Sequence, residues 1–118
     1  MSDTDTRPTT RPTERTAGGT TVVTLSGDVD LVTALSLGPR LDVLTAGPRP
    51  NLVLDLRQVP FVDCAGLGLL CRARNRVAAR EGRLWLVTGS ASFRRLLHHS
   101  GLADAFHLVP EPADIPAA

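Results

Sequence analysis

The sequence predicts an α/β domain with a four- to five-stranded, mostly parallel sheet covered by helices. Short aliphatic and β-branched runs alternate with segments whose apolar residues recur at helical spacing, in the order β-α-β-α-β-α-β. Strands separated by helices pair in parallel through right-handed crossovers, which gives the sheet its direction. With 118 residues, 42% of them apolar, the chain can build one domain around one core.

The first strand and helix are predicted in the first half of the chain. Residues 21–25 are β-branched and end at Ser26-Gly27, which is typical of a strand. Residues 31–46 form the first predicted helix, and Asp30 is its expected N-cap. Its core stripe consists of Ala34, Leu37, Leu41 and Leu44. We expect Gly38-Pro39 to kink or split this helix, because proline removes a backbone donor.

The second strand and helix follow. Residues 51–56 form an aliphatic run that indicates a strand buried on both faces. A helix is predicted to begin near Asp63 or Cys64 and to run to about Glu81. Its core stripe consists of Leu67, Leu70, Ala73 and Val77. Gly82 stands where a glycine commonly ends a helix.

The last elements are shorter. Residues 83–88 form the third predicted strand, and residues 91–99 a short helix with Phe93, Leu96 and Leu97 turned inward. Ser100-Gly101 closes this helix, and residues 105–109 form the last strand.

The two ends of the chain differ from the middle in composition. Residues 1–19 are rich in Thr, Arg and Pro and poor in apolar side chains, so we predict a disordered tail. Within it, Pro12–Thr16 is an alternative candidate for an edge strand that turns at Gly18-Gly19. The folded domain is expected over residues 20–110, followed by a short flexible tail over 111–118.

Composition excludes several functions. All 13 cationic side chains are Arg, so lysine chemistry is impossible, and the net charge of +1 gives no drive toward nucleic acid. Aromatic residues make up only 3% of the chain, too few for base-stacking platforms. No apolar run approaches the roughly 20 residues of a membrane span, and no signal peptide is visible. We therefore expect a cytoplasmic protein without a membrane or nucleic-acid partner.

The two cysteines, Cys64 and Cys71, are predicted to be reduced thiols. On one helix they lie roughly 10 Å apart along the axis, too far for a disulfide. The chain has no Cys-x-x-Cys pair and no Cys/His spacing of a metal site. We expect no metal and no cofactor.

The most informative segment is Phe61-Val-Asp-Cys-Ala-Gly-Leu-Gly68. It follows a strand and opens a helix, whose first N–H groups are therefore free. Gly66 and Gly68 lack side chains, so another backbone can approach closely.

This segment resembles the signature loop of STAS domains, the fold of bacterial anti-sigma factor antagonists. Three further features match the family in order, and the resemblance spans residues 20–109. They are Gly27-Asp-Val-Asp30, Leu52-Val-Leu-Asp-Leu56 and Arg95-Leu-Leu-His-His-Ser-Gly-Leu102.

The resemblance implies partner switching. Such an antagonist binds an anti-sigma factor, often of the histidine-kinase-like ATPase type, and so frees a sigma factor. The implied partner-binding loop consists of Asp63, Cys64, Ala65, Gly66, Leu67 and Gly68. The resemblance also points to Asp28 and Asp30, although turn and cap chemistry explains these two equally well. Asp63 serves as an N-cap on either interpretation.

The sequence departs from the family at Cys64. In many members this position is a serine that the partner kinase phosphorylates, and phosphorylation disrupts binding. Neither Cys64 nor Ala65 can accept phosphate from a Ser/Thr kinase, so the electrostatic switch is absent. Cys64 is either a small, semi-buried helix-start residue or a modifiable thiol. Without control by the thiol or by expression level, the protein is a constitutive antagonist or serves a non-kinase partner.

Other interpretations remain. A STAS domain can also be a ligand-binding or transporter-accessory module, in which the free N–H groups at residues 64–68 hold an anion. Arg72, Arg76 and Arg80 form either a solvated helix face or a nucleic-acid patch. An enzyme is disfavoured, because Leu70 replaces the arginine of a Cys-x5-Arg phosphatase loop and Cys71 replaces the third glycine of Gly-x-Gly-x-x-Gly.

Overall fold

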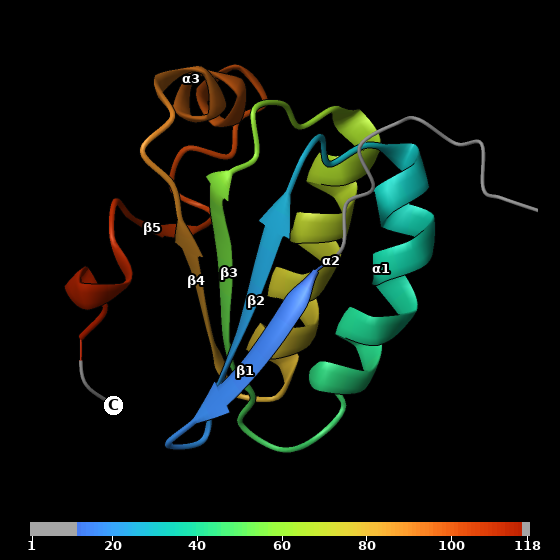
Figure 1. Ribbon diagram of the computed structural model, residues 1–118, viewed down its shortest axis with the longest axis vertical. Helices are drawn as coiled ribbons and strands as arrows, with labels where there is room; N and C mark the ends of the chain where they lie inside the picture. The colour runs from blue at the N-terminus through green and yellow to red at the C-terminus, as the bar shows by residue number, and fades with distance from the viewer. Residues whose placement is uncertain (1–11, 117–118) are drawn as a thin grey trace, which may run out of the picture.

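The computed structural model describes residues 12–116, which form one five-stranded sheet with helices (Figure 1). The elements in chain order are β1 (Thr13–Ala17), β2 (Thr20–Ser26), α1 (Leu31–Leu44), β3 (Asn51–Gln58), α2 (Cys64–Ala79), β4 (Arg83–Val87), α3 (Ala91–His99), β5 (His107–Val109) and the 3₁₀ turn η1 (Pro112–Asp114). The strand order is β1-β2-β3-β4-β5. The edge strand β1 is antiparallel to β2, and all other pairs are parallel. The predicted fold class is therefore confirmed. None of the helices in this range is long and apolar enough to cross a membrane.

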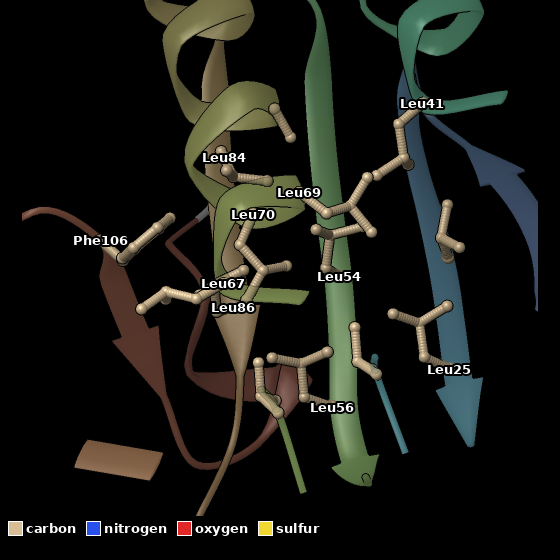
Figure 2. Packing of buried hydrophobic residues seen from close by; sticks show 14 of the residues in the cluster. Leu25, Leu41, Leu54, Leu56, Leu67, Leu69, Leu70, Leu84, Leu86 and Phe106 are labelled. Carbon is tan, nitrogen blue, oxygen red and sulfur yellow. The ribbon is translucent and has the colours of Figure 1, made fainter. Parts of the chain in front are cut away.

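The core lies between the sheet and helices α1 and α2 (Figure 2), and α3 adds Phe93 and Leu97 to it. Alternate strand residues such as Leu25, Leu54 and Leu86 face the helices, because successive side chains of a strand point to opposite faces. Leu41 of α1 and Leu70 of α2 close the cluster from the helix side. This packing holds the N-terminal ends of α1 and α2 at a defined place beside the sheet.

The opposite face of the sheet carries a smaller cluster, in which Val53 and Val87 are buried and Ile115 packs over them. Residues 52–56 of β3 are thus buried on both faces, as predicted for the run 51–56, while the last two residues of the strand are exposed. Arg57 donates to the carboxylates of both Asp55 and Glu111, which ties the segment after β5 to the end of β3. The Arg57 guanidinium holds the pKa of Asp55 below its usual value. The described part of the segment predicted as a flexible tail, residues 111–116, contains the turn η1 and this ion pair to β3.

Strand β1 lies within the segment that the sequence assigned to a disordered tail. Its five residues are all exposed, so no hydrophobic pattern reveals it. Pairing with β2 orders it, from Thr13 opposite Thr24 to Ala17 opposite Thr20. An ion pair from Glu14 to Arg40, at 2.6 Å, anchors it to α1.

The alternative of an edge strand turning at Gly18-Gly19 is the correct one, and the domain begins before residue 20. The rest of the predicted tail, residues 1–11, lies outside the described residues.

Of the kink or split expected at Gly38-Pro39, the split does not occur, because helix α1 runs from Leu31 to Leu44 through Pro39. Pro39 cannot donate to the carbonyl of Leu35, four residues earlier. Both residues are exposed on the outer face of the helix, where water can satisfy that carbonyl. The lost bond is therefore tolerated.

The arginines of α2 connect this helix to α1. Arg72 binds Asp42 through two nitrogens, at 3.0 and 2.9 Å. Arg76 donates to the hydroxyl of Thr45 and to the carbonyl of Asp42. The Arg72 guanidinium lowers the pKa of the Asp42 carboxyl. These two cations are engaged within the fold, which weakens the interpretation as a nucleic-acid patch.

Helix α2 ends differently from the prediction. The N–H of Glu81 donates to the carbonyl of Ala78 and that of Gly82 to the carbonyl of Val77, which is the Schellman arrangement. The left-handed residue is Glu81, with φ of 58°, and not Gly82. Gly82 is needed for another reason: a Cβ there would lie 2.1 Å from the carbonyl oxygen of Pro50.

Substitutions at these two neighbouring positions should act in opposite directions. Glu81→Gly is expected to raise the free energy of unfolding by about 1 kcal/mol, because glycine adopts positive φ without strain. Gly82→Ala is expected to lower it by about 2 kcal/mol, because α2 must move away from Pro50. Urea denaturation of both variants checks this. A destabilising Glu81→Gly together with a neutral Gly82→Ala would contradict the assignment.

Candidate functional site

The predicted loop and the predicted Asp28–Asp30 turn form one site at the carboxyl ends of β2 and β3. Val29 and Val62 make an isolated parallel bridge. The N–H of Val29 donates to the carbonyl of Phe61 at 2.9 Å, and the N–H of Asp63 donates to the carbonyl of Val29 at 3.2 Å. Two segments more than thirty residues apart are thus held in register by backbone hydrogen bonds.

Two of the three aspartates of this site cap the adjacent helices. The Asp63 carboxylate accepts from the N–H of Gly66 at 2.8 Å, and the Asp30 carboxylate accepts from the N–H of Thr33 at 3.1 Å. The hydroxyl of Thr33 also donates to the carbonyl of Asp28 at 3.0 Å. The two bonds to the carboxylates satisfy N–H groups that a helix start otherwise leaves free. The first turns of α1 and α2 are therefore rigid parts of the site.

The two glycines of the loop have different roles. A Cβ on Gly66 would lie 2.1 Å from the carbonyl oxygen of Val29, so only glycine permits the contact between α2 and the Asp28–Asp30 turn. A Cβ on Gly68 would meet nothing within 4 Å. The close backbone approach expected at both glycines thus occurs inside the domain at Gly66, while Gly68 leaves the surface open.

The site residues divide by exposure. Three are exposed: Asp28, Cys64 and Gly68. Three are half-buried: Asp30, Asp63 and Ala65. Gly66 and Leu67 are buried, and Leu67 belongs to the main core. Gly66 and Leu67 therefore lie beneath the surface and support it.

Comparison with known proteins is consistent with this architecture. Residues 11–115 match the family model of the STAS domain. The chain belongs to the STAS domain family. In this STAS domain the matched region runs from the start of β1 through the segment after η1.

Several relatives of this STAS domain carry functional names. The anti-sigma-F factor antagonist RsfB of Mycobacterium tuberculosis is 29% identical over 90 residues, which cover 76% of this chain and 73% of RsfB. The crystal structure of an anti-sigma factor antagonist from Mycobacterium paratuberculosis is 30% identical, with a TM-score of 0.79 and 92% of each chain covered. A putative anti-sigma factor antagonist from Thermotoga maritima has a TM-score of 0.80 at 14% identity, covers 87% of this chain and 89% of its own, and shares the fold.

The STAS domain also exposes apolar side chains on the β3–α2 loop and at the start of α1, and the sequence motifs single out none of those on α1. Leu31, Val32 and Leu35 on the first turns of α1 are 57, 57 and 70% exposed, and Phe61 in the β3–α2 loop is 56% exposed. The sequence signal is a surplus of apolar residues in 31–46, beyond those needed for one core stripe. These four residues lie at the start of α1 and in the β3–α2 loop. The bridge between Val29 and Val62 holds these two segments together.

The side chains of this surface are of kinds that occur at protein interfaces. Cys64 and Cys71 are both free thiols. Within residues 12–116, no three His, Cys, Asp or Glu side chains gather as metal ligands would. The exposed groups are carboxylates, one thiol and apolar side chains, a mixture that can bind another protein by shape, apolar burial and a few polar contacts.

Proposed function

We propose that the protein is a cytoplasmic anti-sigma factor antagonist, which binds an anti-sigma factor and thereby frees a sigma factor. The observation that carries the proposal is the preassembled surface formed by the β3–α2 loop and the start of α1. It presents Asp28, Cys64 and Gly68 beside the exposed Leu31 and Phe61. The antagonist names of the mycobacterial relatives support this assignment.

The partner is proposed to be an anti-sigma factor of the histidine-kinase-like ATPase type. The contact set is the loop from Asp63 to Gly68, with Asp28 and Asp30 in the adjacent turn. Because the loop is held in place by backbone hydrogen bonds, little ordering entropy opposes binding. Affinity capture from the cell of origin tests the proposal. Recovery of such an ATPase is expected, and capture of no anti-sigma factor would contradict it.

We propose that Cys64 stands at the position where many members of the family carry a phosphorylated serine, because it directly follows the loop residue Asp63. It is the first residue of α2 and is exposed, so a kinase could reach this position. The residue has no hydroxyl, however, and Ala65 beside it has none either. We propose that binding at this surface is constitutive with respect to phosphorylation.

Labelling by the partner kinase with radioactive ATP tests this consequence. The wild-type protein is expected to remain unlabelled in the loop, whereas Cys64→Ser should gain label at residue 64. The substitution adds the missing acceptor without changing the backbone around it. Label found within residues 61–68 of the wild-type chain would overturn the proposal of a lost switch.

A further inference from the structure

An open cleft of about 150 Å³ lies between the β3–α2 loop and α3. Figure 1 shows α3 over the same end of the sheet at which this loop leaves β3. The walls are formed by Val59, Pro60 and Phe61 from the loop and by Phe93 and Leu96 from α3. Phe61 belongs both to this cleft and to the proposed partner surface.

The lining of the cleft is mostly apolar and carries no charged residue. Its hydroxyl groups are engaged within the fold: Ser90 Oγ accepts from the N–H of Phe93 at 3.1 Å and shares a hydrogen bond with Ser92 Oγ at 2.9 Å. Thr88 Oγ1 accepts from the N–H of Ser90 at 3.2 Å. A polar metabolite needs several polar groups that fix its orientation, whereas this cleft offers only three hydroxyl side chains, each of which already takes part in a hydrogen bond within the fold.

The size of the cleft matches one large hydrophobic side chain. An apolar cavity of about 150 Å³ accommodates a benzene-sized group. Protein interfaces commonly place an apolar anchor of this size in a pocket near the centre of the contact. An exposed pocket that shares a wall with the partner surface is suited to that role.

We propose that this cleft is an anchor pocket, which receives one leucine-, methionine- or phenylalanine-sized side chain of the anti-sigma factor. The inference rests on the proposed function, because it concerns the same partner. It extends the proposed contact surface from the β3–α2 loop to α3. No sequence motif predicted that α3 takes part in binding. The occupant is an uncharged side chain, since the cleft offers no counter-charge.

Filling the pocket from its rim tests the proposal. Ser92→Phe is expected to weaken binding of the captured anti-sigma factor by about 30-fold, because the new ring occupies the space of the anchor. Ala91→Phe is the matched control, since Ala91 is the exposed neighbour on α3 and does not line the cleft. Its affinity should equal that of the wild type. Equal affinities of all three proteins would overturn the anchor pocket and leave the proposed function intact.

A second measurement is independent of any variant. Addition of the anti-sigma factor to the labelled wild-type protein should shift the amide resonances of Phe93 and Leu96 together with those of the loop. Shifts confined to the loop would contradict the proposal. Benzene serves as a probe: shifts of these amides with benzene, but not with the partner, would assign the cleft to a small molecule instead. Failure of the wild type to bind any anti-sigma factor would remove both proposals.

Discussion

Gly66→Ala is expected to lower the free energy of unfolding by about 3 kcal/mol and to disrupt the site. Its new Cβ would stand 2.1 Å from the carbonyl oxygen of Val29, which is backbone and cannot rotate away. The start of α2 must therefore move from the Asp28–Asp30 turn, with loss of the hydrogen bond between Asp63 and Val29. Overpacking of this kind costs about 1–3 kcal/mol, and each lost hydrogen bond adds about 1 kcal/mol.

Gly68→Ala provides the matched control, two residues farther along the same helix. No atom lies within 4 Å of a Cβ at Gly68, so alanine should stabilise the helix by about 0.5–1 kcal/mol. Urea denaturation of both variants measures the difference. If Gly66→Ala proves as stable as Gly68→Ala, the contact between α2 and the turn is not what requires a glycine.

Cys64→Asp is expected to weaken binding of the anti-sigma factor by about 100-fold while leaving the protein folded. The new carboxylate would stand beside Asp63 in the centre of the proposed contact. An unpaired charge desolvated at an interface costs about 2–5 kcal/mol. The folded state should tolerate it, because a negative charge near a helix N-terminus is favourable. Calorimetric titration measures the affinity.

Cys64→Ser is the neutral counterpart of this variant. It differs from the wild type by one atom, so in the absence of kinase activity its affinity should match that of the wild type. Comparison of the two variants separates the effect of the added charge on affinity from the effect of losing the thiol. Equal binding by Cys64→Asp and Cys64→Ser would place residue 64 outside the contact.

Elements with local signals could be predicted closely from the sequence. Helix α3 occupies the range 91–99 that the sequence predicts, because Ser90 caps its start and Gly101, with φ of 73°, ends it. Strand β1 has no such signal: its exposed residues become a strand only by pairing with β2. The role of Gly82 was likewise misplaced, because the residue that requires it is Pro50, which only the tertiary fold brings close.

The candidate site could likewise be predicted only in part from the sequence. The family motif located the loop and the turn, and Asp30 and Asp63 are the predicted caps. The hydrogen bonds that join these segments depend on the neighbouring positions of β2 and β3, which spacing along the chain does not reveal. The exposed apolar start of α1 could not be recognised either. Residues 31–46 contain more apolar positions than one core stripe needs, and only the packed structure shows which of them remain on the surface.

The most direct test of the central proposal is release of a sigma factor from its anti-sigma factor in a reconstituted mixture. The captured anti-sigma factor is first bound to its fluorescently labelled sigma factor, and the wild-type protein is then titrated in. We predict that free sigma factor rises with added protein to near completion, also after preincubation with the kinase partner and ATP. A sigma factor that stays bound at saturating protein, although the protein itself binds the anti-sigma factor, would contradict antagonist function.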